Sequence, residues 1–115
     1  MTTYSQASTE PVRRHQIARY AAAVDDFNPM HVDEDFATSA GMPSVIAHGP
    51  LSVALALDAI VGQVGADRCR RLDARLTAPV FPGDVLTVTP TDDGADVAKQ
   101  DGTVVLKLTL EIEDA

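Results

Sequence analysis

One acidic and one basic side chain lie on either side of a rigid bend in this chain. Asp26 and His31 flank Asn28-Pro29. Proline lacks an N–H group and disfavours the helical region for the residue before it, so the chain must bend between the two side chains. A carboxylate and an imidazole on one bend form a candidate acid/base pair.

A second short stretch, His48-Gly49-Pro50, provides a complementary feature. It precedes the most apolar segment of the chain, and proline is well accepted in the first turn of a helix. The free amides and the positive dipole end of a helix N-terminus stabilise negative charge. An acid/base pair on one loop and such amides on the next suffice for chemistry beside a polarised carbonyl group.

Three segments have the pattern of helices. Apolar residues recur at helical spacing from residue 13 to 24, and a brief helix from residue 33 or 34 to about 39 ends at Gly41. Asp33 is expected to cap this brief helix. Residues 51–64 have almost no polar face, so we expect that helix to be buried on all sides. Its one ionisable residue is Asp58.

Alternating apolar and polar residues predict strands in the remaining segments, including a long one that ends at a Phe-Pro-Gly-Asp turn or bulge. The predicted strands are residues 8–12, 71–80, 85–91, 97–100 and 103–112. This order predicts an α+β fold in which a curved antiparallel sheet wraps around one long helix. The outer face of such a sheet needs a cover, which indicates a dimer. We expect one domain over residues 1–115.

The composition of the chain limits which kinds of binding partner and which cellular locations are plausible. The 115 residues carry a net charge of -8, which argues against binding to nucleic acid or to an anionic membrane surface. One cysteine, Cys69, excludes an internal disulfide and a cysteine-only metal site. The first ten residues lack the pattern of an export signal, and no apolar run reaches 18 residues. We expect a cytoplasmic protein without a cofactor or a metal ion.

Several of these motifs together resemble a known family. Residues 20–33, with Phe36-Ala37, Gly41 and residues 46–49, resemble the signature of the MaoC-like dehydratases, also called (R)-specific enoyl-CoA hydratases. Residues 78–86 resemble the strand motif of the same family, and the resemblance covers about residues 11–91. It implies the hot-dog fold, an antiparallel sheet around a long helix, usually paired into a dimer.

The resemblance also implies an activity, the hydration of (2E)-enoyl thioesters to (3R)-3-hydroxyacyl thioesters and the reverse dehydration. Asp26 and His31 would be the catalytic pair, and the backbone N–H of Gly49 would bind the thioester oxygen. Which of Asp26 and His31 takes the water proton stays open. The substrate would be carried by coenzyme A or by an acyl carrier protein, and the dimer could contain two identical chains or two different hot-dog chains.

Three further residues near the implied site have two interpretations each. Asn28 is a structural turn residue or a substrate contact. His48 contacts the pantetheine path or simply bonds the loop. Ser52, one turn into the apolar helix, is a local structural hydroxyl or a neighbour of the thioester.

The sequence departs from the family pattern at three points. Val24-Asp25 stands where Ser-Gly is common before the catalytic aspartate, and we expect Asp25 to face solvent. Pro50 can offer no N–H to an oxyanion. The chain ends at Ala115, where family members usually add a strand, so the sheet would be four-stranded or completed by a partner subunit.

Two other functions remain as alternatives. Some hot-dog thioesterases use a carboxylate on the central helix, a role that only Asp58 could take, although it lies deep in the helix. A non-catalytic, acyl-binding subunit of a dehydratase is the other alternative, although the chain retains both Asp26 and His31.

The densest basic group could meet a phosphate or an acidic carrier protein, or form a solvated turn paired with aspartates. That group comprises Arg68, Arg70, Arg71 and Arg75.

Overall fold

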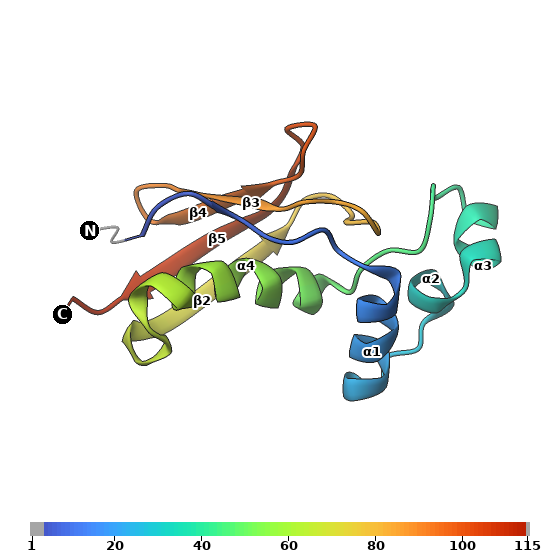
Figure 1. Ribbon diagram of the computed structural model, residues 1–115, viewed down its shortest axis with the longest axis horizontal. Helices are drawn as coiled ribbons and strands as arrows, with labels where there is room; N and C mark the ends of the chain where they lie inside the picture. The colour runs from blue at the N-terminus through green and yellow to red at the C-terminus, as the bar shows by residue number, and fades with distance from the viewer. Residues whose placement is uncertain (1–3, 115) are drawn as a thin grey trace.

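A five-stranded antiparallel sheet curves over one long helix (Figure 1). The sequence predicted this arrangement of a curved antiparallel sheet around a helix. The structure is a computed structural model that describes residues 4–114. Its helices are α1 (Arg14–Val24), α2 (Pro29–Val32), α3 (Glu34–Ser39), α4 (Gly49–Val64) and the 3-10 turn η1 (Ala66–Arg68). Its strands are β1 (Ala7–Ser8), β2 (Cys69–Leu76), β3 (Thr87–Pro90), β4 (Gly94–Ala98) and β5 (Val104–Ile112). The ends of the predicted domain, residues 1–3 and 115, lie outside the described residues.

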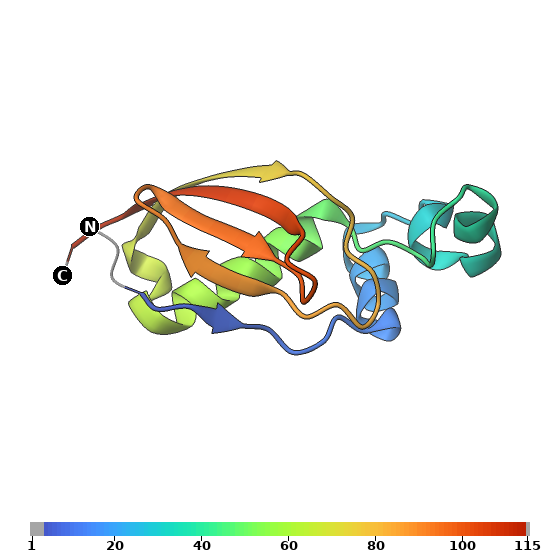
Figure 2. The ribbon, with the colours of Figure 1, turned by 90° about the horizontal axis from the view of Figure 1, so that it is seen from above.

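The strands lie in the order β1-β3-β4-β5-β2, and every neighbouring pair is antiparallel. Figure 2 shows α4 crossing beneath the sheet. The first strand corrects two expectations. It covers Ala7–Ser8 instead of residues 8–12, and it pairs with β3, so the sheet has five strands and not four. β2 pairs with β5 on one side only, which leaves its other edge free within the described residues.

The core forms between the sheet and one face of α4. Ala56 and Ile60 of the helix are fully buried in the same cluster as Val97 and Leu106 of the sheet. Full burial of a large apolar side chain stabilises a fold by about 1.5–3 kcal/mol. The opposite face of α4 is exposed at every fourth residue, namely Ala54, Asp58 and Gly62. The expectation that α4 is buried on all sides is therefore wrong for a single chain, because one sheet covers only one face.

The segment from α1 to α3 projects beyond one end of the sheet (Figure 1). The expected bend over residues 25–33 contains a short helix, α2, which begins at Pro29 and is capped by the side chain of Asn28. Proline suits this first position because its missing N–H would have no helical acceptor there. α3 begins after Asp33, whose carboxylate accepts from the amide of Phe36. The predicted cap is confirmed.

Glu34 ties the projecting segment together. Its carboxylate pairs with Arg14 of α1 at 3.1 Å and accepts from the Ser44 hydroxyl at 2.9 Å and from the Val45 amide at 3.0 Å. These contacts lower the pKa of Glu34 from its ordinary value, with the Arg14 hydrogen bond as the largest cause. Three parts of the chain, α1, α3 and the loop before α4, therefore meet at one carboxylate.

A buried carboxylate anchors the same loop to the sheet. Asp84 accepts from the amide of Phe81 at 2.8 Å and lies 3.5 Å from the ammonium group of Lys99. This fixes the turn before β3, and the carbonyl of Val80 in that turn accepts from the amide of Ala47 at 2.8 Å. The backbone that leads into α4 is thus held from the sheet side.

Candidate active site

The backbone at Asp25 and Asp26 sets the position of the first candidate side chain. Asp25 ends α1 in the left-handed conformation, with φ 57°, and its side chain is exposed as expected. The amide of Asp26 donates to the carbonyl of Ala21, and one carboxylate oxygen of Asp26 accepts from the amide of Asn28 at 3.3 Å. The second carboxylate oxygen has no partner among residues 4–114 and is free to hold a ligand.

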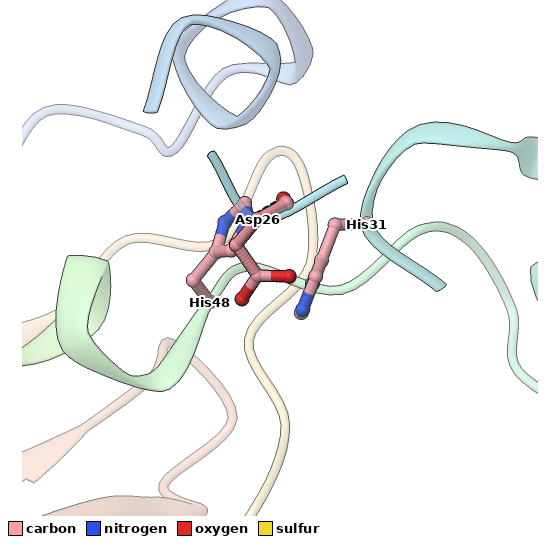
Figure 3. Close-up of side chains that lie close together, drawn as sticks. All are labelled: Asp26, His31 and His48. Carbon is pink, nitrogen blue, oxygen red and sulfur yellow. Dashed lines mark hydrogen bonds between the residues drawn. The ribbon is translucent and has the colours of Figure 1, made fainter. Parts of the chain in front are cut away.

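His31 lies on α2, and a hydrogen bond to the backbone helps to orient its ring. Its Nδ1 atom lies 2.7 Å from the carbonyl oxygen of Ile46. A carbonyl can only accept, so Nδ1 carries a hydrogen. The Nε2 atom of the neutral ring then holds a lone pair. His31 is half-buried and presents this nitrogen beside the carboxylate of Asp26 (Figure 3).

His48, the cap residue of α4, lies behind the pair. Its side chain is 1% exposed, and its Nε2 donates to the backbone carbonyl of Asp26 at 3.0 Å. Its ring stacks on that of His31, with centroids 3.8 Å apart and planes 23° apart (Figure 3). The ring of Tyr20 packs against it at 4.9 Å. Its Nδ1 is buried without a hydrogen-bond partner among the described residues.

The N-terminus of α4 follows immediately. Gly49 is the first residue of the helix, Pro50 the second, and the amide of Ser52 closes the first turn on the His48 carbonyl at 3.1 Å. No acceptor within residues 4–114 pairs with the N–H of Gly49. Leu76, at the end of β2, covers Gly49 so closely that a Cβ atom there would lie 2.4 Å from its Cδ1. The free amide therefore has an apolar neighbour.

The structure brings some predicted residues together and leaves others apart. Asp26, His31 and His48 each offer a donor or acceptor atom within 4.8 Å of the others, and Gly49 follows His48 directly. Asn28 caps α2 through its side chain, and Ser52 is buried in the first turn of α4. Asp58 lies nine residues beyond Gly49, about 13 Å along the helix axis.

The cluster of Asp26, His31 and His48 has the residue types of a metal site. Two of its nitrogens are already committed, because Nδ1 of His31 and Nε2 of His48 both face backbone carbonyls. Figure 3 shows one nitrogen of His48, Nε2, hydrogen-bonded to the backbone carbonyl of Asp26. This arrangement suits proton transfer to and from Nε2 of His31, with the Asp26 carboxylate beside it as a hydrogen-bond acceptor. The expectation of no metal stays a prediction.

A wide cleft lies beside this site and not on it. It measures about 820 Å³ between α1, α4 and the segment after β1. Tyr20, Leu51 and Asp58 line it, whereas the Asp26–His31 pair does not. The cleft approaches the site through Tyr20, whose ring packs on His48, and through Leu51 in the first turn of α4.

The basic group is mostly paired locally. Arg70 forms an ion pair with Glu113, and Arg71 pairs with Asp73 at 3.0 Å. Arg68 donates to the backbone carbonyl of Glu113 at 2.7 Å. These contacts support local pairing of the basic group, but Arg70, Arg71 and Arg75 lie on strand β2 and not in a turn. Arg75 has no ion pair within the described part of the chain.

Two contributors to the site were not found in the sequence. Tyr20 belongs to the predicted helix over residues 13–24 and begins the family signature, but neither its spacing nor the signature indicates the contact with His48. The carbonyl of Ile46 is a backbone atom, which every residue has, so only its position in space gives it a role.

The fold and this arrangement define a hot-dog protein with an acid/base pair beside a helix N-terminus. The family model described as the MaoC like domain matches residues 2–113. The chain therefore belongs to the MaoC-like dehydratase family.

Named relatives agree with this. The chain is 37% identical over 103 residues to 3-hydroxyacyl-thioester dehydratase Y of Mycobacterium tuberculosis, an alignment that covers 80% of this chain and 35% of that protein. It is 36% identical over 72 residues to enoyl-CoA hydratase ChsH3 of the same organism, covering 60% of this chain and 25% of the relative. The chain thus spans about a third or less of these relatives.

The solved structures agree with the fold. The R-hydratase PhaJ1 from Pseudomonas aeruginosa has a TM-score of 0.78 at 26% identity, covering 99% of this chain and 84% of that one. The (R)-hydratase from A. caviae has a TM-score of 0.80 at 22% identity, covering 100% and 98%. The second likeness shows the fold alone. No helix in residues 4–114 has the length and apolarity needed to cross a membrane.

Proposed function

We propose that this protein hydrates (2E)-enoyl thioesters to (3R)-3-hydroxyacyl thioesters and catalyses the reverse dehydration. The observation that carries the proposal is the juxtaposition of Asp26 and His31 beside the free amide of Gly49. The names of relatives support the reaction class, since they include a 3-hydroxyacyl-thioester dehydratase and an enoyl-CoA hydratase. The likeness to PhaJ1, an R-hydratase, supports the stereochemistry.

The hydrogen bond from His31 to Ile46 supports different roles for Asp26 and His31 in the reaction. Because Nδ1 of His31 holds its hydrogen on that carbonyl, Nε2 is the atom that takes the proton from water. The free carboxylate oxygen of Asp26 accepts the other hydrogen of the water and orients it. The water oxygen bonds to C3, and His31 returns the proton to C2. Positioned proton transfer of this kind contributes roughly 10²–10⁴-fold.

The N-terminus of α4 acts on the thioester oxygen, at the other end of the reacting group from C3. Addition at C3 places negative charge on the thioester oxygen, and the Gly49 amide with the dipole of the 16-residue α4 stabilises it there. Losing one such donor costs about 2.7–4 kcal/mol of barrier. Pro50 contributes no N–H, so Gly49 carries this role within the first two positions.

A substrate screen tests the proposal. The wild-type chain is incubated with crotonyl-CoA, with longer (2E)-enoyl-CoAs and with the same acyl groups on an acyl carrier protein, and the products are separated by chirality. We expect (3R)-3-hydroxyacyl products, and their loss in His31→Ala with Asp58→Asn as the control. Full activity in His31→Ala, or no hydration of any acyl group, contradicts the proposal.

The same screen decides between the proposal and the two alternatives. Release of free thiol from saturated acyl-CoA would indicate a thioesterase, and Asp58→Asn would then be the variant that loses activity. Binding of acyl thioesters without turnover would indicate an acyl-binding subunit.

We propose a dimer as the working assembly, formed with a second copy or with a different hot-dog chain. The exposed face of α4 and the free edge of β2 support this. One structural neighbour, the ChsH1-ChsH2 complex from Mycobacterium tuberculosis, is by its name an assembly of two chains. The screen is therefore repeated with a neighbouring hot-dog chain added.

Coenzyme A and acyl carrier protein both remain candidate carriers, and the cytoplasm remains the proposed location.

A further inference from the structure

His48 is buried between two rings that belong to the site. His31 stacks on it at 3.8 Å and Tyr20 packs on it at 4.9 Å, while only 1% of its surface is exposed. A side chain this deeply covered does not contact a pantetheine arm. The interpretation of His48 as a substrate contact is therefore not supported, and its hydrogen bond to the loop is the observed one.

The protonation state of His48 follows from its neighbours. Nε2 faces the backbone carbonyl of Asp26 at 3.0 Å, and a carbonyl accepts but never donates, so the hydrogen is on Nε2. Nδ1 then holds a lone pair, and it is buried without a partner among residues 4–114. A protonated ring would bury an unpaired N–H as well as a charge, which is unfavourable. The geometry fits a neutral ring.

The unpartnered Nδ1 indicates what the side chain is for. A residue needed only to fill space between Tyr20 and His31 would be served by an apolar ring, because a buried nitrogen without a hydrogen bond is destabilising. In His48 the unpaired Nδ1 is accompanied by one directed contact, the hydrogen bond from Nε2 to the backbone carbonyl of Asp26. That contact fixes the backbone of the residue whose carboxylate faces His31.

We propose that His48 is a positioning residue that acts on both members of the proposed catalytic pair. Its Nε2–H holds the main chain of Asp26, and its ring is the flat surface against which His31 is aligned (Figure 3). It touches neither the water nor the thioester. This role rests on the proposed hydratase function for its effect on rate, but not for its effect on the geometry of the two histidines.

Two substitutions at position 48 separate the ring from the hydrogen bond. His48→Phe retains an aromatic ring for stacking and lacks the donor. His48→Gln lacks the ring and can place an amide N–H where Nε2 lies. We expect kcat of His48→Phe to fall by about 10²-fold with KM nearly unchanged, since a misplacement near 1 Å can cost that much. We expect His48→Gln to recover about tenfold of that loss, the worth of roughly one hydrogen bond.

The exposed His15 provides the matched control, because His15→Phe makes the same chemical change on α1 away from the pair. Wild-type kcat in His48→Phe overturns the proposal. Equal losses in His48→Phe and His48→Gln also overturn it, since a merely space-filling histidine would give no recovery with glutamine. A rise in KM with unchanged kcat would return His48 to substrate contact and overturn it too.

A spectroscopic measurement on the wild-type chain needs neither activity nor a folded variant. The chain has three histidines, and 15N-labelled imidazoles report which nitrogen carries hydrogen. We expect His48 to be in the Nε2–H form and His31 in the Nδ1–H form when neutral, while His15 shows the mixture of a solvated ring. An Nδ1–H form of His48 overturns the proposal. A wild-type chain with these tautomers but no hydratase activity would instead contradict the proposed function.

Discussion

The Nδ1 atom of His31 lies 2.7 Å from the carbonyl oxygen of Ile46, and this contact leaves only Nε2 of the ring for chemistry. Ile46 belongs to the loop that Glu34 and Val80 hold from two sides. The orientation of a proposed catalytic base therefore depends on contacts made by Glu34 and Val80, which lie outside the cluster of Asp26, His31 and His48.

The backbone at Asp25 gives a stability prediction. A residue with a side chain in the left-handed conformation is strained by about 1–2 kcal/mol relative to glycine, less so for aspartate. We expect Asp25→Gly to be more stable than Asp25→Ala by about 1 kcal/mol, with activity unchanged in both. Urea unfolding measures the difference. Equal stability of the two variants would show that position 25 does not hold the left-handed conformation.

This position also explains one departure from the family pattern. Glycine, common in the family before the catalytic aspartate, adopts the left-handed conformation without strain. Aspartate tolerates it better than most residues, so Asp25 performs the same backbone role here.

Asn28 has a structural contact that can be removed alone. Its side chain accepts from the amide of Met30 at 3.0 Å and caps α2, which carries His31. We expect Asn28→Ala to lose about 1 kcal/mol of stability and Asn28→Asp to retain the cap. KM separates the two interpretations of Asn28. A large rise in KM in Asn28→Asp, with stability intact, would indicate a substrate contact.

Gly49 and Leu76 are predicted to be coupled. An alanine at position 49 would place its Cβ 2.4 Å from Cδ1 of Leu76. Leu76 is 56% exposed and can move, so we expect Gly49→Ala to fold normally but to lose activity as Leu76 is displaced around the amide. Leu76→Ala in the same chain should restore part of the rate. A double-mutant cycle on kcat/KM should give a coupling of about 0.5–3 kcal/mol, and strictly additive losses would contradict the contact.

The lowered pKa of Glu34 predicts an acid sensitivity of the loop before α4. Its ordinary value is 4.5, and its hydrogen bonds to Arg14, Ser44 and Val45 lower it in the folded protein. A lowered carboxyl pKa adds stability above the unfolded value, and that stability is lost as the pH falls through the folded value. We expect the Tm of the wild type to fall below pH 4.5 more steeply than that of Glu34→Gln. Parallel curves would contradict this.

Local signals predicted much of the fold. Helical spacing located α1 to within a residue, the Asp33 cap and Gly41 bounded α3, and alternation located β5. Such features depend on residues that are close in sequence. The short helix α2 was missed because Asn28-Pro29 predicts a turn equally well with or without one helical turn after it.

The site was only partly predictable for the same reason. Asp26, His31 and Gly49 were found because they belong to spaced motifs. The burial of His48 between Tyr20 and His31 joins three distant segments, and no periodicity in any of them encodes it. The faces of α4 were misjudged because composition shows that a helix is apolar all round but not how many of its faces one sheet can cover.

The most direct test of the account is kcat for hydration of crotonyl-CoA by Asp26→Asn compared with the wild type. Asparagine keeps an oxygen that can accept from the amide of Asn28, so the fold is retained while the carboxylate is lost. The account predicts an unchanged Tm and a fall in kcat of about 10²-fold, because the amide NH2 that replaces the free carboxylate oxygen cannot accept the water hydrogen and the water is misplaced. A folded Asp26→Asn chain that hydrates crotonyl-CoA at the wild-type rate would contradict it.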